Sequence, residues 1–161
     1  MNEVQEYLTE RGIPFELVPH GSSDTSVGEA LALGVRADEV LKAILIHTSS
    51  GPAIVVIPAD ERVDMLLVRG AVADHHARLA TEAEIRRDFP QFELGALPPI
   101  GSLFGARTLL DPEILWHDRV SFAAGSRTLS VTVRTEDVFR AEPVQVVPLV
   151  ASNEEDKQPI R

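Results

Sequence analysis

The chain has 161 residues, the size of one ordinary domain. Acidic residues outnumber basic ones by 25 to 15, and the formal net charge of −10 argues against a protein that coats nucleic acid through a positive field. The absence of cysteine excludes disulfides, cysteine-ligated metal centres and a thiol nucleophile. The sequence shows no signal peptide and no apolar run near the roughly 20 residues that span a bilayer, so we expect a cytoplasmic protein without a membrane segment.

The N-terminal part of the chain predicts two helices and one strand. Residues 2–11 carry apolar side chains at helical spacing and are predicted to form a helix. Residues 13–18 are predicted to form a strand, and the proline within it favours a sheet edge. Residues 26–29 read Ser-Val-Gly-Glu, a capping-box pattern that predicts a helix beginning at Ser26 and ending at Gly34.

The central part predicts a hairpin and two further helices. Residues 40–47 and 53–57 are apolar runs joined by a Ser/Gly/Pro turn, which is typical of a hairpin at the centre of a sheet. Helices are expected over residues 64–73 and 81–90, the second opened by another capping box. Residues 95–105 contain three glycines and two prolines and are expected to be irregular.

The C-terminal part predicts four short strands, over residues 107–110, 119–123, 129–133 and 144–147. Short helical segments are expected over residues 112–116 and 136–140. Strands and helices do not alternate strictly, so the sequence predicts an α/β (α+β-like) domain with a mixed sheet of six to seven strands and short flanking helices. We expect one domain over residues 1–150 and a polar, disordered tail over residues 151–161.

Common catalytic signatures are missing from the sequence. The phosphate-binding loop, the dinucleotide glycine pattern, the zinc-protease helix motif and the serine-hydrolase elbow do not occur. The tripeptide Asp74-His75-His76 raises the hypothesis of a metal-dependent phosphoesterase. The alternative is a polar connector that follows a helix.

Lys42 stands alone within the most apolar run of the chain. Strand alternation places its side chain on the same face as Ile44 and Ile46, where a cation is costly without a partner. Thirteen of the 15 cations are arginine, and the second lysine, Lys157, falls in the predicted tail. A lysine here therefore indicates either contact with a phosphate or a ribose hydroxyl, or a strand-end side chain that reaches water.

Three other segments could contribute to a site. The loop Gly-Ala-Leu-Pro-Pro-Ile-Gly over residues 95–101 is stiffened by its prolines, and rigid main-chain amides can hold a carbonyl or an oxyanion. The turn Gly125-Ser126-Arg127 leads into a strand, and His20 precedes a Gly-Ser-Ser-Asp-Thr loop. Each of these segments could equally be an ordinary connection.

Taken in order, these features resemble the YbaK-type family, the prolyl-tRNA-editing or aminoacyl-tRNA deacylase domain. The similarity runs from about residue 20 to residue 140 and begins with His20 and Thr25, followed by Lys42 in its apolar strand. The other matching positions are Gly95, Pro99 and Gly101 in the glycine–proline loop, Asp111 after a strand, and Gly125 and Arg127 in the turn.

The resemblance implies a mixed α/β fold and hydrolysis of the ester between a wrong amino acid and the terminal adenosine of a tRNA, in trans or as a domain of prolyl-tRNA synthetase. It implies that Lys42 lies near the 3′-terminal nucleotide and that Gly95 positions the aminoacyl carbonyl, so both are predicted to be catalytic. The residues it predicts to bind substrate are His20, Thr25, Pro99, Gly101, Asp111, Gly125, Ser126 and Arg127. It implies no metal and no other cofactor, because the substrate's own hydroxyl or side chain assists. The expected partner is the acceptor end of an aminoacyl-tRNA, with a synthetase as a second candidate, and neither membrane nor DNA is expected.

Three positions depart from the family pattern. Ala43 follows the lysine where threonine or asparagine is common, Ser126 stands where some members have histidine, and Asp24 stands where an aromatic residue is common. These positions leave the substrate amino acid open.

We expect a trans-acting deacylase for a small misattached amino acid. The alternatives are a catalytically silent module that binds aminoacyl-tRNA or a synthetase, and the metal phosphoesterase.

Overall fold

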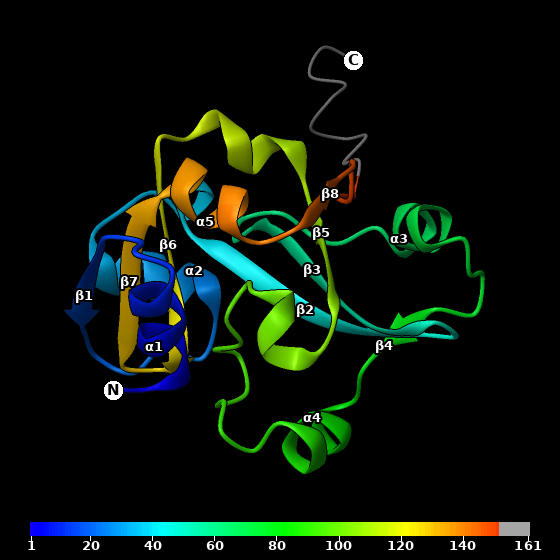
Figure 1. Ribbon diagram of the computed structural model, residues 1–161, viewed down its shortest axis with the longest axis horizontal. Coiled ribbons are helices and arrows are strands. Elements are labelled where there is room, and N and C mark those ends of the chain that lie inside the picture. The colour runs from blue at the N-terminus through cyan, green and yellow to red at the C-terminus, as the bar shows by residue number, and fades with distance from the viewer. Residues whose placement is uncertain (152–161) are drawn as a thin grey trace, which may run out of the picture.

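The computed structural model describes residues 1–151, which form eight strands in two sheets and five α-helices (Figure 1). The predicted mixed α/β class is confirmed. The prediction of a single sheet of six to seven strands is wrong, because the strands divide into a three-stranded and a five-stranded sheet. The unpredicted strand, β4 (Arg78–Leu79), has two residues, too few for any periodic pattern. Apart from Ala151, the predicted tail over residues 151–161 lies outside the described residues.

The smaller sheet is antiparallel and has the order β1-β7-β6. Its strands are β1 (Phe15–Pro19), β6 (Arg119–Ser126) and β7 (Leu129–Arg134). The first strand lies at an edge, as predicted, although Pro14, on which that prediction rested, precedes β1. β6 ends at Ser126 rather than at the predicted Ala123, and the register of the β6–β7 hairpin shifts between these two residues.

The larger sheet has the order β4-β2-β3-β5-β8. Its longer strands are β2 (Leu41–Thr48) and β3 (Gly51–Pro58), which form the predicted antiparallel hairpin at the centre of the sheet. The strands β5 (Arg107–Leu110) and β8 (Val144–Val146) continue the sheet in parallel. The larger sheet is therefore mixed.

The α-helices are α1 (Glu3–Glu10), α2 (Ser26–Leu33), α3 (Met65–Val72), α4 (Glu82–Asp88) and α5 (Thr135–Ala141). Three 3-10 helices lie between strands, η1 (Ala37–Glu39), η2 (Gly101–Phe104) and η3 (Pro112–Trp116). The capping box predicted for α4 is present, with Thr81 and Glu84 as its members.

The start of α2 at Ser26 agrees with the prediction, but the capping interaction differs. Thr25 caps this helix by accepting a hydrogen bond from Gly28 N at 3.0 Å, so Ser26 is the first helical residue. The Glu29 side chain is therefore free of any capping role and is buried within the protein. Thr25, rather than the predicted box of Ser26 and Glu29, therefore caps the helix where the loop meets it.

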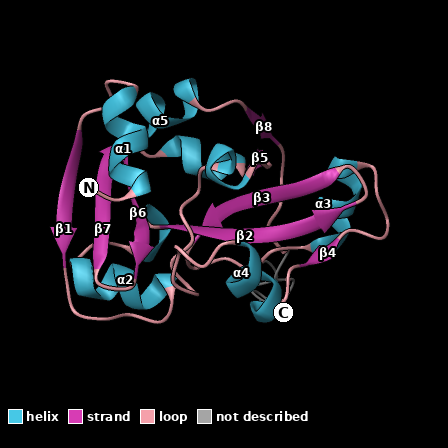
Figure 2. Ribbon diagram, turned by 60° about the horizontal axis from the view of Figure 1, so that its bottom comes forward, coloured by secondary structure: helices cyan, strands magenta, loops and turns pink. Residues whose placement is uncertain are grey.

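The β2–β3 hairpin, which is seen along its length in Figure 2, has side chains in two hydrophobic clusters. Leu45 and Val56 belong to the larger cluster, which extends to α1 and the smaller sheet. Ile46 and Val55 belong to the second cluster, which includes Val68 of α3. The two faces of β2 therefore have different surroundings, and this difference shapes the site described next.

Candidate active site

A gap along one edge of β2 forms the candidate site. At one end of this edge Val40, the residue before β2, forms a parallel bridge with Ser121 of β6. At the other end Ile46 pairs with Leu79 of β4. Between these points no described strand pairs with that edge, and a cavity of about 560 Å³ opens there.

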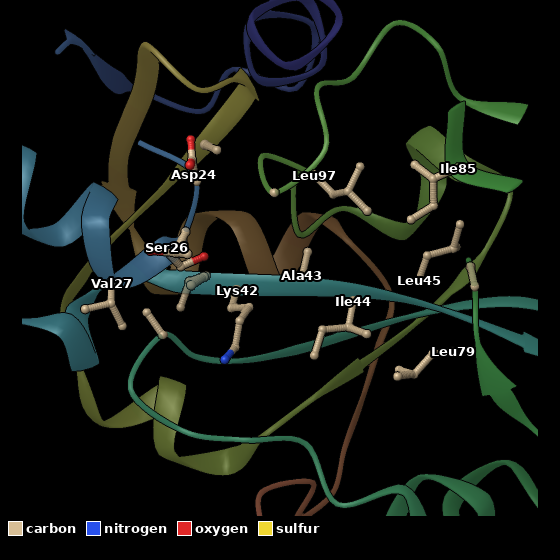
Figure 3. A pocket seen from close by; sticks show the side chains of 16 residues that line it. Asp24, Ser26, Val27, Lys42, Ala43, Ile44, Leu45, Leu79, Ile85 and Leu97 are labelled. Atoms are coloured by element: carbon tan, nitrogen blue, oxygen red, sulfur yellow. The ribbon is translucent and has the colours of Figure 1, made fainter. Parts of the chain in front are cut away.

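The lining comes from segments that are distant in sequence. It comprises Asp24, Thr25, Ser26 and Val27 at the start of α2, Leu41, Lys42, Ala43, Ile44 and Leu45 of β2, Leu79, Ala80 and Ile85 near β4 and α4, Gly95 and Leu97 of the glycine–proline loop, and Ala59 and Ala123. Figure 3 shows that Ala43 and Leu45 lie on one side of β2, towards Leu97, and that Lys42 and Ile44 lie on the other. The cavity thus has a half that contains an ammonium group and a mostly apolar half, with Asp24 on the same side of β2 as the apolar half.

Lys42 has a specific partner for its charge. Its Nζ donates a hydrogen bond to the main-chain oxygen of Glu61 at 2.7 Å. Partial burial lowers the pKa of this lysine, and the negative charges of Asp60 and Glu61 offset part of that effect. An ammonium group has three donors, so the carbonyl contact leaves donors that can bind an anion or a hydroxyl in the cavity.

Gly95 brings the glycine–proline loop against the loop before α2. Its φ is 80°, in the left-handed region that favours glycine. A Cβ at this position would overlap the main-chain oxygen of Asp24. Any other residue would therefore strain the backbone and push apart two segments that line the cavity.

Arg127 joins the same two segments from outside the cavity. Its main-chain N–H donates to Glu93 Oε1 at 3.0 Å, and its Nε donates to the main-chain oxygen of Leu94 at 2.9 Å. Its own main-chain oxygen accepts from Ser23 N at 3.1 Å. Arg127 therefore fixes Leu94 and Ser23, which directly precede the lining residues Gly95 and Asp24.

The half-buried His20 belongs to a network behind the start of α2, whose members Ser130 and Glu29 are buried. Its Nδ1 contacts the main-chain oxygen of Gly21 at 2.8 Å, and its Nε2 contacts Ser130 Oγ at 2.8 Å. Ser130 Oγ in turn donates to the carboxylate of Glu29. Burial raises the pKa of Glu29, although Ser130 and the His20 charge act in the opposite direction. The network ties the loop before α2 to β7.

Sequence reasoning missed Glu29 and Ser130 as members of this network. Glu29 lies one helical turn after Thr25, and the sequence pattern placed it in a capping box with Ser26 rather than in a contact with another strand. Ser130 is a fully buried hydroxyl in a strand with alternating polar residues, which gives no signal of its partner.

The other predicted site residues lie outside the cavity lining. Gly101 is buried and donates its N–H to Thr108 Oγ1 at 3.0 Å. Asp111 is also buried, caps η3 and accepts from Leu149 N at 2.9 Å. Pro99 and Gly125 are buried, and Ser126 contacts Thr128 Oγ1 at 3.0 Å. Of the ten predicted residues, the lining contains Thr25, Lys42 and Gly95.

The Asp74-His75-His76 segment forms a turn after α3. Asp74 accepts hydrogen bonds from Ser49 N at 2.7 Å and from His76 N at 2.9 Å. Both of its carboxylate oxygens thus stabilise the local backbone. Across residues 1–151, no group of three histidine or acidic side chains is arranged to hold a metal ion. In the same part of the chain, no helix has the length and apolar character to cross a membrane.

Comparison with known proteins identifies relatives of this fold. A family model described as aminoacyl-tRNA editing domain matches residues 20–141. The solved structure of the hypothetical protein APE2540 has a TM-score of 0.84 and 21% identity, covering 93% of this chain and 100% of its own. A candidate trans-editing enzyme for prolyl-tRNA synthetase has a TM-score of 0.82 and 21% identity, with 94% of this chain and 99% of that chain covered. No curated protein sequence matches the chain.

Proposed function

Because the chain belongs to the aminoacyl-tRNA editing domain family, we propose that it is a trans-acting deacylase. It hydrolyses the ester between a small misattached amino acid and the 3′-terminal adenosine of a tRNA, and it acts in the cytoplasm. The observation that carries this proposal is the meeting of Thr25, Lys42 and Gly95 at one cavity of about 560 Å³. That volume lies in the range of small-molecule sites. The similarity to a candidate trans-editing enzyme supports action in trans.

The proposed reaction needs positioning more than a protein nucleophile. Water attacks the ester carbonyl carbon, the bond from that carbon to the ribose oxygen breaks, and the ribose oxygen takes up a proton. An aminoacyl ester is already activated, so orientation and stabilisation of the oxyanion can supply most of the rate gain. Lys42 would bind the terminal nucleotide, and the main chain around Gly95 would orient the carbonyl. The proposal invokes no metal and no other cofactor.

The acidic balance of the chain limits the proposed contact with RNA. A net charge of −10 does not favour broad contact with the tRNA body. An enzyme that holds only the acceptor end contacts few phosphates, so we expect a shallow dependence of binding on salt. A synthetase partner could supply the remaining affinity for tRNA.

The test is a deacylation screen with tRNAs mischarged with alanine, serine, cysteine or threonine. We expect the wild-type protein to release at least one amino acid in the presence of chelator, and Lys42→Ala to slow release roughly 100-fold, because a preorganised charge at the site is lost. Arg140→Ala is the matched control, since Arg140 is exposed on α5 and pairs with Glu136. Equal rates for wild type and Lys42→Ala would contradict the role of Lys42.

A second candidate is a binding module of the same fold that has lost hydrolysis. The apolar Ala43, which follows Lys42 in the cavity, motivates it, because this position offers no side-chain hydrogen bond to a substrate. Retention of aminoacyl-tRNA with no deacylation of any member of the panel would favour this module over the enzyme.

A further inference from the structure

The main-chain N–H and C=O of Ala43 face the cavity. In an antiparallel pair, the main-chain groups of successive residues point alternately towards and away from the partner strand. The main-chain oxygen of Val40 accepts from Ala59 N at 2.9 Å on the β3 side, and that of Leu45 accepts from Ala80 N at 2.9 Å on the opposite side. Ala43 is two residues from Leu45 and three from Val40, so its main-chain groups point away from β3.

The register of the neighbouring strands supports the same orientation. Ala43 lies opposite Val56, whose main-chain oxygen accepts from Asp111 N at 3.0 Å on the β5 side. The pair Ala43–Val56 is therefore one that exchanges no hydrogen bonds. Among the described strands, β4 pairs only with Ile46 and His47 of β2, and the bridge to β6 is at Val40. One donor and one acceptor of the β2 edge thus open into the cavity at Ala43.

We propose that this open edge recognises the aminoacyl group as if it were one residue of an added β-strand, an inference that rests on the proposed function. An aminoacyl ester carries an amino group and a carbonyl oxygen, the same donor and acceptor that a strand residue presents to its partner. The Ala43 C=O accepts from the α-amino group, and the Ala43 N–H donates to the ester carbonyl oxygen. Because negative charge develops on that oxygen during attack, the second bond strengthens in the transition state.

This pairing also decides where the substrate side chain lies. Residues that face each other in an antiparallel pair place their side chains on the same face of the sheet. The side chain of an L-amino acid therefore lies beside Ala43 and Leu45, in the half of the cavity that Leu97 and Ile85 border (Figure 3). Lys42 lies on the other face of β2, towards which a D-amino acid would direct its side chain.

The substrate class follows from these neighbours. These four side chains are apolar, and Ala43, the direct cross-strand neighbour, is the smallest of them. A small aliphatic side chain fits this half of the cavity, whereas a hydroxyl group would be buried there without a hydrogen-bond partner from these four side chains. The edge geometry thus assigns an L-aminoacyl ester with a small apolar side chain as the preferred substrate.

The direct test uses 3′-(L-alanylamino)-3′-deoxyadenosine, in which an amide replaces the labile ester. Amide hydrogen exchange is followed by NMR on the whole protein with and without this compound. We expect the exchange of the Ala43 amide to slow at least tenfold at saturation and the D-alanyl compound to bind at least tenfold more weakly. Binding without protection of Ala43, or equal affinity for the two isomers, would overturn the edge pairing and leave the proposed function intact. Absence of both binding and deacylation would overturn both.

A second test changes the cross-strand neighbour without removing the main-chain groups. Ala43→Ser adds a hydroxyl beside the expected position of the substrate side chain, so the ratio of kcat/KM for seryl-tRNA over alanyl-tRNA should rise about tenfold. Ala123→Ser is the matched control, because Ala123 also lines the cavity but lies on β6. An equal rise in both variants, or a rise in neither, would contradict the assignment of the side-chain position to the Ala43 face.

Discussion

Two buried glutamates, Glu29 and Glu142, are excluded from solvent almost equally, at 3% and 4% exposure, but are hydrogen-bonded very differently. Glu142 accepts from Tyr7 Oη at 2.7 Å, Ser102 N at 2.8 Å and Ser102 Oγ at 2.9 Å. The Glu29 carboxylate has Ser130 as its hydrogen-bond donor, and burial raises its pKa. Since a buried charge needs several donors, Glu142 is well compensated and Glu29 is not.

The position of each glutamate explains this difference. Glu142 directly follows α5 and joins α1 to η2, so it holds elements of the fold together. Glu29 lies in α2, one turn after the residues that line the cavity, and is linked through Ser130 to His20 in the loop before α2. Well-compensated polar networks fix structure, whereas poorly compensated ones tend to occur near functional sites. We therefore expect changes at Glu142 to affect stability and changes around Glu29 to affect activity as well.

The largest expected effect is that of Glu142→Ala. This substitution leaves the buried hydroxyl of Tyr7 and the donors of Ser102 without their acceptor, so we expect a loss of about 3 kcal/mol in the free energy of unfolding. Urea denaturation measures it, with Glu136→Ala on the exposed surface of α5 as the control. Activity per folded molecule should stay unchanged. A loss of activity that exceeds the unfolded fraction would break the proposed division of roles.

Ser130→Ala should affect stability less than Glu142→Ala does, and it should affect activity more. It removes the link between Glu29 and His20 and leaves a buried carboxyl without its donor, at a cost of about 2 kcal/mol. The loop before α2 loses its attachment to β7, so deacylation should fall. Thr132→Ala is the control, because it removes another hydroxyl of β7, one that contacts Ser121 Oγ at 2.8 Å. Full activity of Ser130→Ala would show that the network does not position the site.

Tyr7→Phe removes one of the hydrogen bonds that Glu142 accepts, so the free energy of unfolding should fall by about 1 kcal/mol. Burial raises the pKa of Tyr7 above its ordinary value of 10.0, and Glu142 adds to this effect. A group whose pKa is raised on folding contributes stability that is present below its unfolded pKa and is lost as pH rises further. In thermal melts, the wild-type protein should thus lose stability as pH rises above 10. The Tyr7→Phe variant should not show the part of this loss that comes from Tyr7. Parallel curves for the two proteins would contradict it.

The smallest effect is expected for Glu29→Gln. This substitution should change the free energy of unfolding by less than about 1 kcal/mol near neutral pH, because the amide keeps a hydrogen bond to Ser130. The pKa of Glu29 is raised from 4.5, so its stabilising contribution is present below pH 4.5 and is lost as pH rises through the folded pKa. Wild type should therefore become less stable relative to Glu29→Gln between acid and neutral pH, as measured by urea unfolding at several pH values. An opposite slope would mean that Glu29 is as well compensated as Glu142.

The sequence by itself predicted the features that depend on neighbours along the chain. The β2–β3 hairpin follows from two apolar runs and a turn, and α4 begins at its capping box because both members of that box are local. Lys42 stood out for the same reason, as a charge inside an apolar strand. The family resemblance rested on the order of such local patterns.

Tertiary structure decided the rest. Thr25 and Ser26 both suit a helix cap, and the choice between them depended on Glu29, which packs against Ser130 of β7 instead of capping the helix. The division into two sheets and the open edge at Ala43 depend on where β4 and β6 meet β2, and pairing between distant strands leaves no periodic signal in sequence. A strand pattern shows which side chains share a face, but the neighbours that a strand lacks are visible only once the sheet is formed.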